Sequence, residues 1–128
     1  MGAKDGSTSG ELLVTRTKSF AVRVIRLVDA LPRGRAANVI GQQLLRAATS
    51  VGANYRAARR GRSTAEFCAK LGIVEEEADE CIYWLELLIE ADLVKRHRLQ
   101  PLLEEVNEIL AMTVSSIRTA RARQRGKR

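Results

Sequence analysis

Apolar residues recur along most of the chain at alternating spacings of three and four residues, the period of one face of an α-helix. The longest row passes without a break through Phe67, Leu71, Val74, Ala78, Cys81, Leu85 and Leu88. A row of this length indicates a helix whose apolar side chains pack against neighbouring helices along its whole length. The spacing therefore predicts a long helix inside a helical bundle.

Three other segments show the same period, at about residues 12–31, 35–60 and 96–120. Pro32 and Gly34 end the first, because proline lacks a backbone N–H and glycine relaxes the turn. Ser63 and Glu66 form the S-x-x-E pattern of a capping box, which predicts the start of the third helix. Connections this short force consecutive helices to run antiparallel. We therefore expect an all-α protein, an antiparallel up-down-up-down four-helix bundle.

The bundle is expected to occupy residues 12–120. Residues 1–11 are polar and rich in Gly and Ser, which predicts a disordered leader. After Ile117 the apolar pattern ends and basic residues follow, so residues 121–128 are predicted to form a basic C-terminal tail.

The net charge of +7 is unevenly distributed along the chain. Residues 1–62 hold twelve Lys or Arg against three Asp or Glu, whereas residues 63–117 hold four against twelve. Residues 118–128 hold six basic residues and no acidic one. Such segregation suggests either a polyanionic partner or charge-complementary packing between subunits.

Four arginines, Arg56, Arg59, Arg60 and Arg62, cluster at the end of the second predicted helix and in the turn that follows. Because guanidinium groups match phosphate bidentately, the cluster indicates a nucleic-acid contact. Two other interpretations stay open: an interface with the acidic third helix of another subunit, and a solvated helix end whose cations complement the helix dipole.

Arg16, Arg23 and Arg26 share one face of the first predicted helix, at spacings of seven and three. Helices 1 and 2 are therefore predicted to present a common basic surface. Together with the cluster on helix 2, these three complete a set of seven candidate nucleic-acid-binding arginines. Binding by such a surface is expected to depend steeply on salt and little on sequence.

Nothing in the sequence indicates catalysis, a metal or another cofactor. The only histidine, His97, has no partner for a catalytic or metal site, and no Gly-rich phosphate loop is present. The acidic run from Glu75 to Glu80 is interpreted as a charged face. No apolar run is long enough to cross a membrane and residues 1–11 do not resemble a signal peptide, so we expect a cytoplasmic protein.

Three pairs of residues carry structural predictions. Cys68 and Cys81 are thirteen residues apart in one predicted helix, too far for a disulfide, so both are predicted to be reduced core residues. Ser50 and Asn54 share a face of helix 2 and are predicted to make an interhelical hydrogen bond. One of Tyr83 and Trp84 is predicted to pack at a subunit contact.

Several segments resemble one known family. They are Leu45–Asn54, Arg62–Phe67, Lys70–Ile73, Glu76–Glu80, Tyr83–Leu88 and Ser115–Arg121, in the family's order over roughly residues 14–124. The chain is similar to the 23S rRNA-intervening-sequence four-helix-bundle proteins. This resemblance implies an antiparallel bundle and a ring-shaped homopentamer. It also implies kinship with the accessory variability proteins of diversity-generating retroelements, basic bundles that bind nucleic acid and a reverse transcriptase.

Two functions follow from these observations. The first is a non-enzymatic, basic, homo-oligomeric protein that binds RNA or DNA as an accessory factor, assisting a reverse transcriptase. The second is a structural or protein-interaction bundle whose charge segregation serves subunit assembly. The first expects Arg56, Arg59, Arg60 and Arg62 to be exposed on one face, and the second expects them to be buried against a neighbour's acidic helix.

Overall fold

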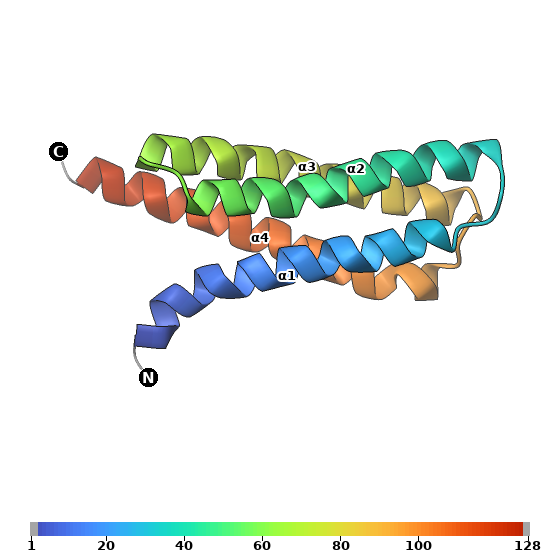
Figure 1. The fold of residues 1–128 in the computed structure, drawn as a ribbon, viewed down its shortest axis with the longest axis horizontal. Coiled ribbons are helices and arrows are strands. Elements are labelled where there is room, and N and C mark those ends of the chain that lie inside the picture. Colours follow the sequence, from blue (N-terminus) through green and yellow to red (C-terminus); the bar gives the residue numbers. More distant parts are fainter. Residues whose placement is uncertain (1–2, 127–128) are drawn as a thin grey trace.

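The computed structural model describes residues 3–126, and these form four helices that run alternately up and down (Figure 1). The helices are α1 (Ala3–Asp29), α2 (Arg35–Arg59), α3 (Thr64–Glu90) and α4 (Arg96–Gly126). No connection between them is longer than five residues, and no residue from 3 to 126 lies in a strand. The predicted all-α, up-down-up-down four-helix bundle is confirmed.

The predicted row on the third helix forms the centre of the core. Leu71, Val74, Ala78, Cys81, Leu85 and Leu88 are all inaccessible to water, while Phe67 at the start of the row is half-buried. Helix α3 packs on α2 and on α4, and α1 packs mainly on α2. The row therefore joins three of the four helices, and α1 completes the bundle chiefly through α2.

Local sequence explains where the inner helix ends lie. Gly34 precedes α2 with φ at 148°, a backbone conformation that residues with a Cβ rarely adopt. At the start of α3 the Glu66 N–H donates to the Ser63 Oγ at 3.1 Å, as the capping box predicted. In a full capping box, the Glu66 carboxylate would accept from the N–H of Ser63. Here it accepts from the N–H of Arg62 instead.

The outer helix ends extend beyond the predicted boundaries. Helix α1 begins at Ala3 within the predicted leader, and α4 continues through the predicted tail to Gly126, whereas residues 1–2 and 127–128 lie outside the described part. The apolar pattern predicts only the part of a helix that packs against other helices. A polar stretch can continue the helix beyond that part, because its backbone hydrogen bonds form within the helix itself. The Tyr55 hydroxyl donates to the Gly10 carbonyl at 3.3 Å, which ties this part of α1 to α2.

Two of the paired-residue predictions are corrected. The Asn54 side chain donates to the Ser50 carbonyl at 3.0 Å and to the Ser50 hydroxyl at 2.8 Å, so this hydrogen bonding lies within α2 and is not interhelical. Residues four apart on a helix are already neighbours and need no second helix to meet. Both cysteines are free, but only Cys81 is a core residue, because Cys68 is half-buried at the first turns of α3.

We predict that the two thiols differ strongly in reactivity. Burial, with Glu77 and Glu80 nearby, raises the pKa of the Cys81 thiol to about 12, so almost none of it is thiolate at mildly alkaline pH. A maleimide added to the native protein is expected to modify Cys68 and spare Cys81 until the chain is denatured. Mass spectrometry of the wild type and of Cys68→Ser measures this, and equal modification of both thiols in the native protein would contradict it.

Candidate nucleic-acid interface

The antiparallel topology brings arginines from distant parts of the chain to one end of the bundle (Figure 1). Helix α2 ends there, the α2–α3 turn lies there, and α4 also ends there. We call this region the basic end and define it by seven exposed residues: Arg56, Arg59, Arg60, Arg62, Arg121, Arg123 and Arg125. Arg123 of α4 lines one groove with Arg62 and another with Arg59. The arginines of α4 therefore form one surface with those of α2 and the α2–α3 turn.

The four arginines at the end of α2 and in the turn carry no ion pair with a carboxylate of residues 10–126. Among residues 10–126, no carboxylate lies within 4.0 Å of the guanidinium groups of Arg56, Arg59, Arg60 or Arg62. Arg46, about three turns before Arg56 on α2, differs from them, because it pairs with Glu77 at 3.1 Å and also with Glu80. These two carboxylates of the acidic run therefore pair with Arg46 and not with the basic end.

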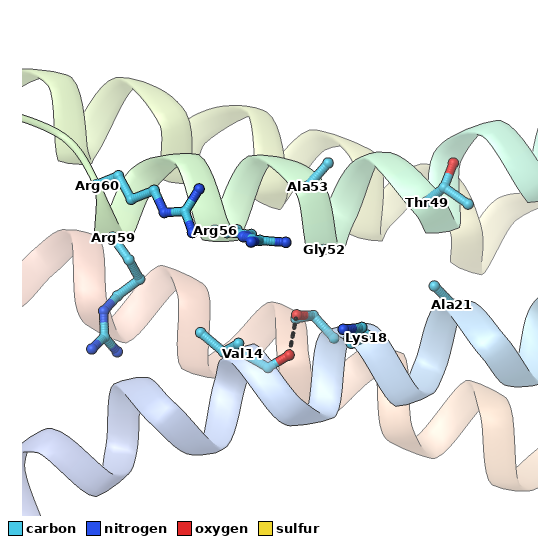
Figure 2. Close-up of a pocket in the computed structure, with 10 residues that line it drawn as sticks. Val14, Lys18, Ala21, Thr49, Gly52, Ala53, Arg56, Arg59 and Arg60 are labelled. Atoms are coloured by element: carbon cyan, nitrogen blue, oxygen red, sulfur yellow. Dashed lines mark hydrogen bonds between the residues drawn. The ribbon is translucent and has the colours of Figure 1, made fainter.

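A groove of about 540 Å³ runs between α1 and α2 beside the basic end (Figure 2). Helix α1 lines it with Val14, Thr17, Lys18 and Ala21, and α2 lines it with Thr49, Gly52, Ala53, Arg56, Arg59 and Arg60. The Thr17 hydroxyl donates to the Val14 carbonyl on its own helix, so this hydrogen atom is not available to a ligand. The groove thus offers four cations over a floor of small, neutral side chains.

Arg59 connects this groove to a second one between α1 and α4. The second groove is lined by Gly10, Ser115, Ser116, Thr119 and Arg123, among others, and Arg59 lies on the edge of both. The guanidinium of Arg59 occupies the space where a Cβ on Gly10 would lie. A glycine at position 10, inside the predicted leader, therefore allows Arg59 to reach across to α1.

The arginines of α1 do not share the basic end. Arg16 is tied to α4, with its Nη2 at 2.6 Å from Glu105 Oε1 and 2.8 Å from Glu108 Oε1, and its Nε at 2.9 Å from Glu105 Oε2. Arg23 is partly buried, and its charge helps to lower the pKa of Glu105. Arg26 is exposed in the last turn of α1, at the opposite end of the bundle. The structure thus separates these three from the α2 cluster.

Sequence reasoning missed Lys18 and Arg123 as members of the candidate site. Lys18 lies between Val14 and Ala21 at spacings of four and three, which would have placed all three on one face of α1. For Arg123 no signal in the sequence was available, because its approach to Arg59 and Arg62 depends on how α4 lies in the bundle.

The described residues show neither a metal cluster nor a membrane span. Between residues 10 and 126, no three His, Cys, Asp or Glu side chains are grouped so that they could hold a metal ion. None of the four helices, as far as they are described, is long and apolar enough to cross a membrane.

Comparison with known proteins identifies the family. The model of the 23S rRNA-intervening sequence protein family matches residues 12–115. The chain belongs to this family. A crystal structure at 1.70 Å of a protein of unknown function, from the S23 ribosomal protein family of Bacteroides thetaiotaomicron, is 34% identical with a TM-score of 0.81. The similarity covers 86% of the present chain and 98% of the other. No curated protein matches.

The family match divides the basic end of this 23S rRNA-intervening sequence protein in two. Arg56, Arg59, Arg60 and Arg62 lie inside the matched region, whereas Arg121, Arg123 and Arg125 follow residue 115, where the match ends. The α4 arginines therefore lie beyond the part of the chain that the family model describes.

We predict that Arg16 stabilises the fold through Glu105. Their mutual hydrogen bonds lower the pKa of Glu105 from 4.5 and raise that of Arg16, and both side chains are about four-fifths buried. Glu105→Gln is expected to lower the free energy of unfolding at neutral pH by about 1 kcal/mol, which urea denaturation followed by circular dichroism measures. Because the folded pKa of Glu105 is depressed, this contribution is present above pH 4.5 and is lost as the pH falls through the folded pKa.

The matched control is Glu104→Gln on the same helix. Glu104 is exposed and accepts a hydrogen bond from the Gln100 side chain, which a glutamine could also accept. This variant should therefore match the wild type at every pH. Equal losses in the two variants at neutral pH would show that the Arg16 ion pairs contribute nothing specific.

Proposed function

We propose that this protein is a non-enzymatic accessory protein that binds nucleic acid through its basic end. One observation carries the proposal: arginines from α2, from the α2–α3 turn and from α4 gather on one exposed surface. The guanidinium groups of Arg56, Arg59, Arg60 and Arg62 have no ion-pair partner among residues 10–126. Like charges gathered in this way repel one another, and a polyanion would relieve that repulsion.

The chemistry of the surface fits a phosphate backbone and not a base sequence. Guanidinium groups donate paired hydrogen bonds to phosphate oxygens, and each neutralised phosphate releases counterions. Tyr55 is buried and Phe67 is half-buried at this end, so neither offers an open ring on which bases could stack. We therefore expect binding that is strongly salt-dependent and nearly independent of sequence.

Assembly and partnership belong to the same proposal. A ring-shaped homopentamer would repeat the basic end around its axis, and several weak phosphate contacts would then act together. Assistance to a reverse transcriptase rests on the resemblance to the accessory variability proteins alone.

A protein-interaction bundle is the second candidate, favoured by the outer surface of α3. Tyr83 is 53% exposed, and Glu76 and Asp79 are exposed on the same helix. A neighbouring subunit could place its own basic end against this acidic surface, and the arginines would then serve assembly.

The test compares two triple variants that remove the same charge. Arg56→Ala/Arg59→Ala/Arg60→Ala alters the basic end, whereas Arg33→Ala/Arg35→Ala/Arg96→Ala removes three exposed arginines at the opposite end of the bundle. Fluorescence anisotropy with structured RNA and with duplex DNA, over a salt series, measures binding. The first variant is expected to weaken binding and to reduce the slope of log K against log salt by about 2 to 3, because each phosphate contact contributes about 1 to that slope.

The control triple variant should bind nearly as the wild type does. Equal weakening by both variants would mean that net charge and not the basic end is responsible, and no binding by the wild type at low salt would refute the proposed function. Mass photometry of the same proteins tests the second candidate. If the basic-end variant dissociates into monomers while the control stays assembled, the arginines serve assembly.

A further inference from the structure

The groove between α1 and α2 differs from the rest of the basic end because it is concave and has two chemically distinct parts. Arg56, Arg59 and Arg60 stand at the end nearer the α2 terminus, and Lys18 lies on α1 opposite Gly52 (Figure 2). The guanidinium of Arg59 points away from Lys18, toward Gly10. Farther along, the lining consists of the small or neutral residues Ala21, Thr49, Gly52 and Ala53. Among residues 10–126, no acidic residue is part of this lining.

The small residues create the space in the groove. Gly52 lies close to α1, since a Cβ on it would be 3.5 Å from the Thr17 carbonyl oxygen, an ordinary van der Waals contact. Ala53 beside it is exposed to the groove. Larger side chains at these positions would fill the volume that now lies open between the helices.

We propose that this groove binds a phosphomonoester with a nucleoside-sized body, the phosphorylated terminal nucleotide of a nucleic-acid strand. The inference rests on the proposed function and assigns to the groove a role that the rest of the basic end lacks. The phosphate lies between Lys18 and Arg56, with Arg59 and Arg60 at the end of the groove, and the nucleoside extends over Gly52 and Ala53. The volume of about 540 Å³ is within the range of small-ligand sites, about 300–1,000 Å³, and is too small for a duplex.

Charge explains why a strand end is preferred to the middle of a strand. A phosphomonoester carries close to two negative charges at neutral pH, whereas each internal phosphodiester carries one. Four cations around one groove interact more strongly with the more highly charged group. A terminal nucleotide also enters a groove between two helices more easily than an internal one, because the chain continues from it in one direction only.

The experiment uses three forms of one short single-stranded oligonucleotide: with a 5′-phosphate, with a 3′-phosphate and with hydroxyls at both ends. A nucleoside monophosphate serves as a competitor and distinguishes a free nucleotide from a strand end. Binding of each probe is measured by anisotropy with the full-length wild type. We expect one or both phosphorylated strands to bind about fivefold more tightly than the unphosphorylated strand.

Two groove variants, each with a matched control, locate the preference. Ala53→Leu fills the groove without changing charge, and Ala36→Leu makes the same change at an exposed position near the start of α2. Lys18→Gln removes the groove cation of α1, and Lys95→Gln removes an exposed lysine before α4. Both groove variants should lose the preference for the terminal phosphate, whereas both controls should keep it.

The outcomes separate this inference from the proposed function. Equal binding of all three strands by the wild type, with loss of binding on mutation of Arg56, Arg59 and Arg60, would overturn the inference and leave nucleic-acid binding intact. A preference that survives Ala53→Leu would overturn the groove as its location. Competition by the nucleoside monophosphate at a concentration similar to that of the phosphorylated strand would support the groove site but show that the strand adds nothing. Binding of the monophosphate without binding of any strand would support the groove as a phosphomonoester site and refute the proposed function.

Discussion

Water does not reach the row of side chains from Leu71 to Leu88 on α3, and α2 and α4 both pack on the helix that carries it. Burying each large apolar side chain of such a row stabilises the fold by about 1.5–3 kcal/mol, so a slip of either neighbour along α3 is costly. The short connections then leave one arrangement, in which α2 and α4 end on the same side. The basic end follows from this core, because packing on α3 keeps the ends of α2 and α4 on the same side of the bundle.

Arginine serves two purposes in this bundle, and the partners of each residue distinguish them. Arg16 pairs with Glu105 and Glu108 on α4, and Arg46 pairs with Glu77 and Glu80 on α3. Such pairs link helices and leave little positive charge for a ligand. At the basic end the guanidinium groups are exposed, so water and small ions weaken their mutual repulsion and largely screen it beyond about 10 Å. A partner that replaces those small ions would act on this second group only.

Periodicity was sufficient for the fold but not for its outer boundaries. The α3 row, the start and end of α2 and the Ser63 cap were all predictable, because each depends on neighbours within a few residues. The start of α1 at Ala3 and the end of α4 at Gly126 were not, because polar residues continue a helix without leaving an apolar pattern. The hydrogen bond of Asn54 to Ser50 shows a related limit: helical spacing predicted that the two share a face but not that they are each other's partners.

The candidate site was predictable only as far as a single helix defines it. Arg56, Arg59, Arg60 and Arg62 are close in the sequence, so their grouping needed no tertiary information. On α1, the spacing of seven residues places Arg16 and Arg23 on one face of the helix. It does not predict which neighbouring helix packs against that face. In the structure, Arg16 on this face of α1 pairs with Glu105 and Glu108 of α4. A different face of α1 lines the groove with α2. Lys18 lies on it, which is why a residue without a basic neighbour in the sequence joins the arginines at the groove.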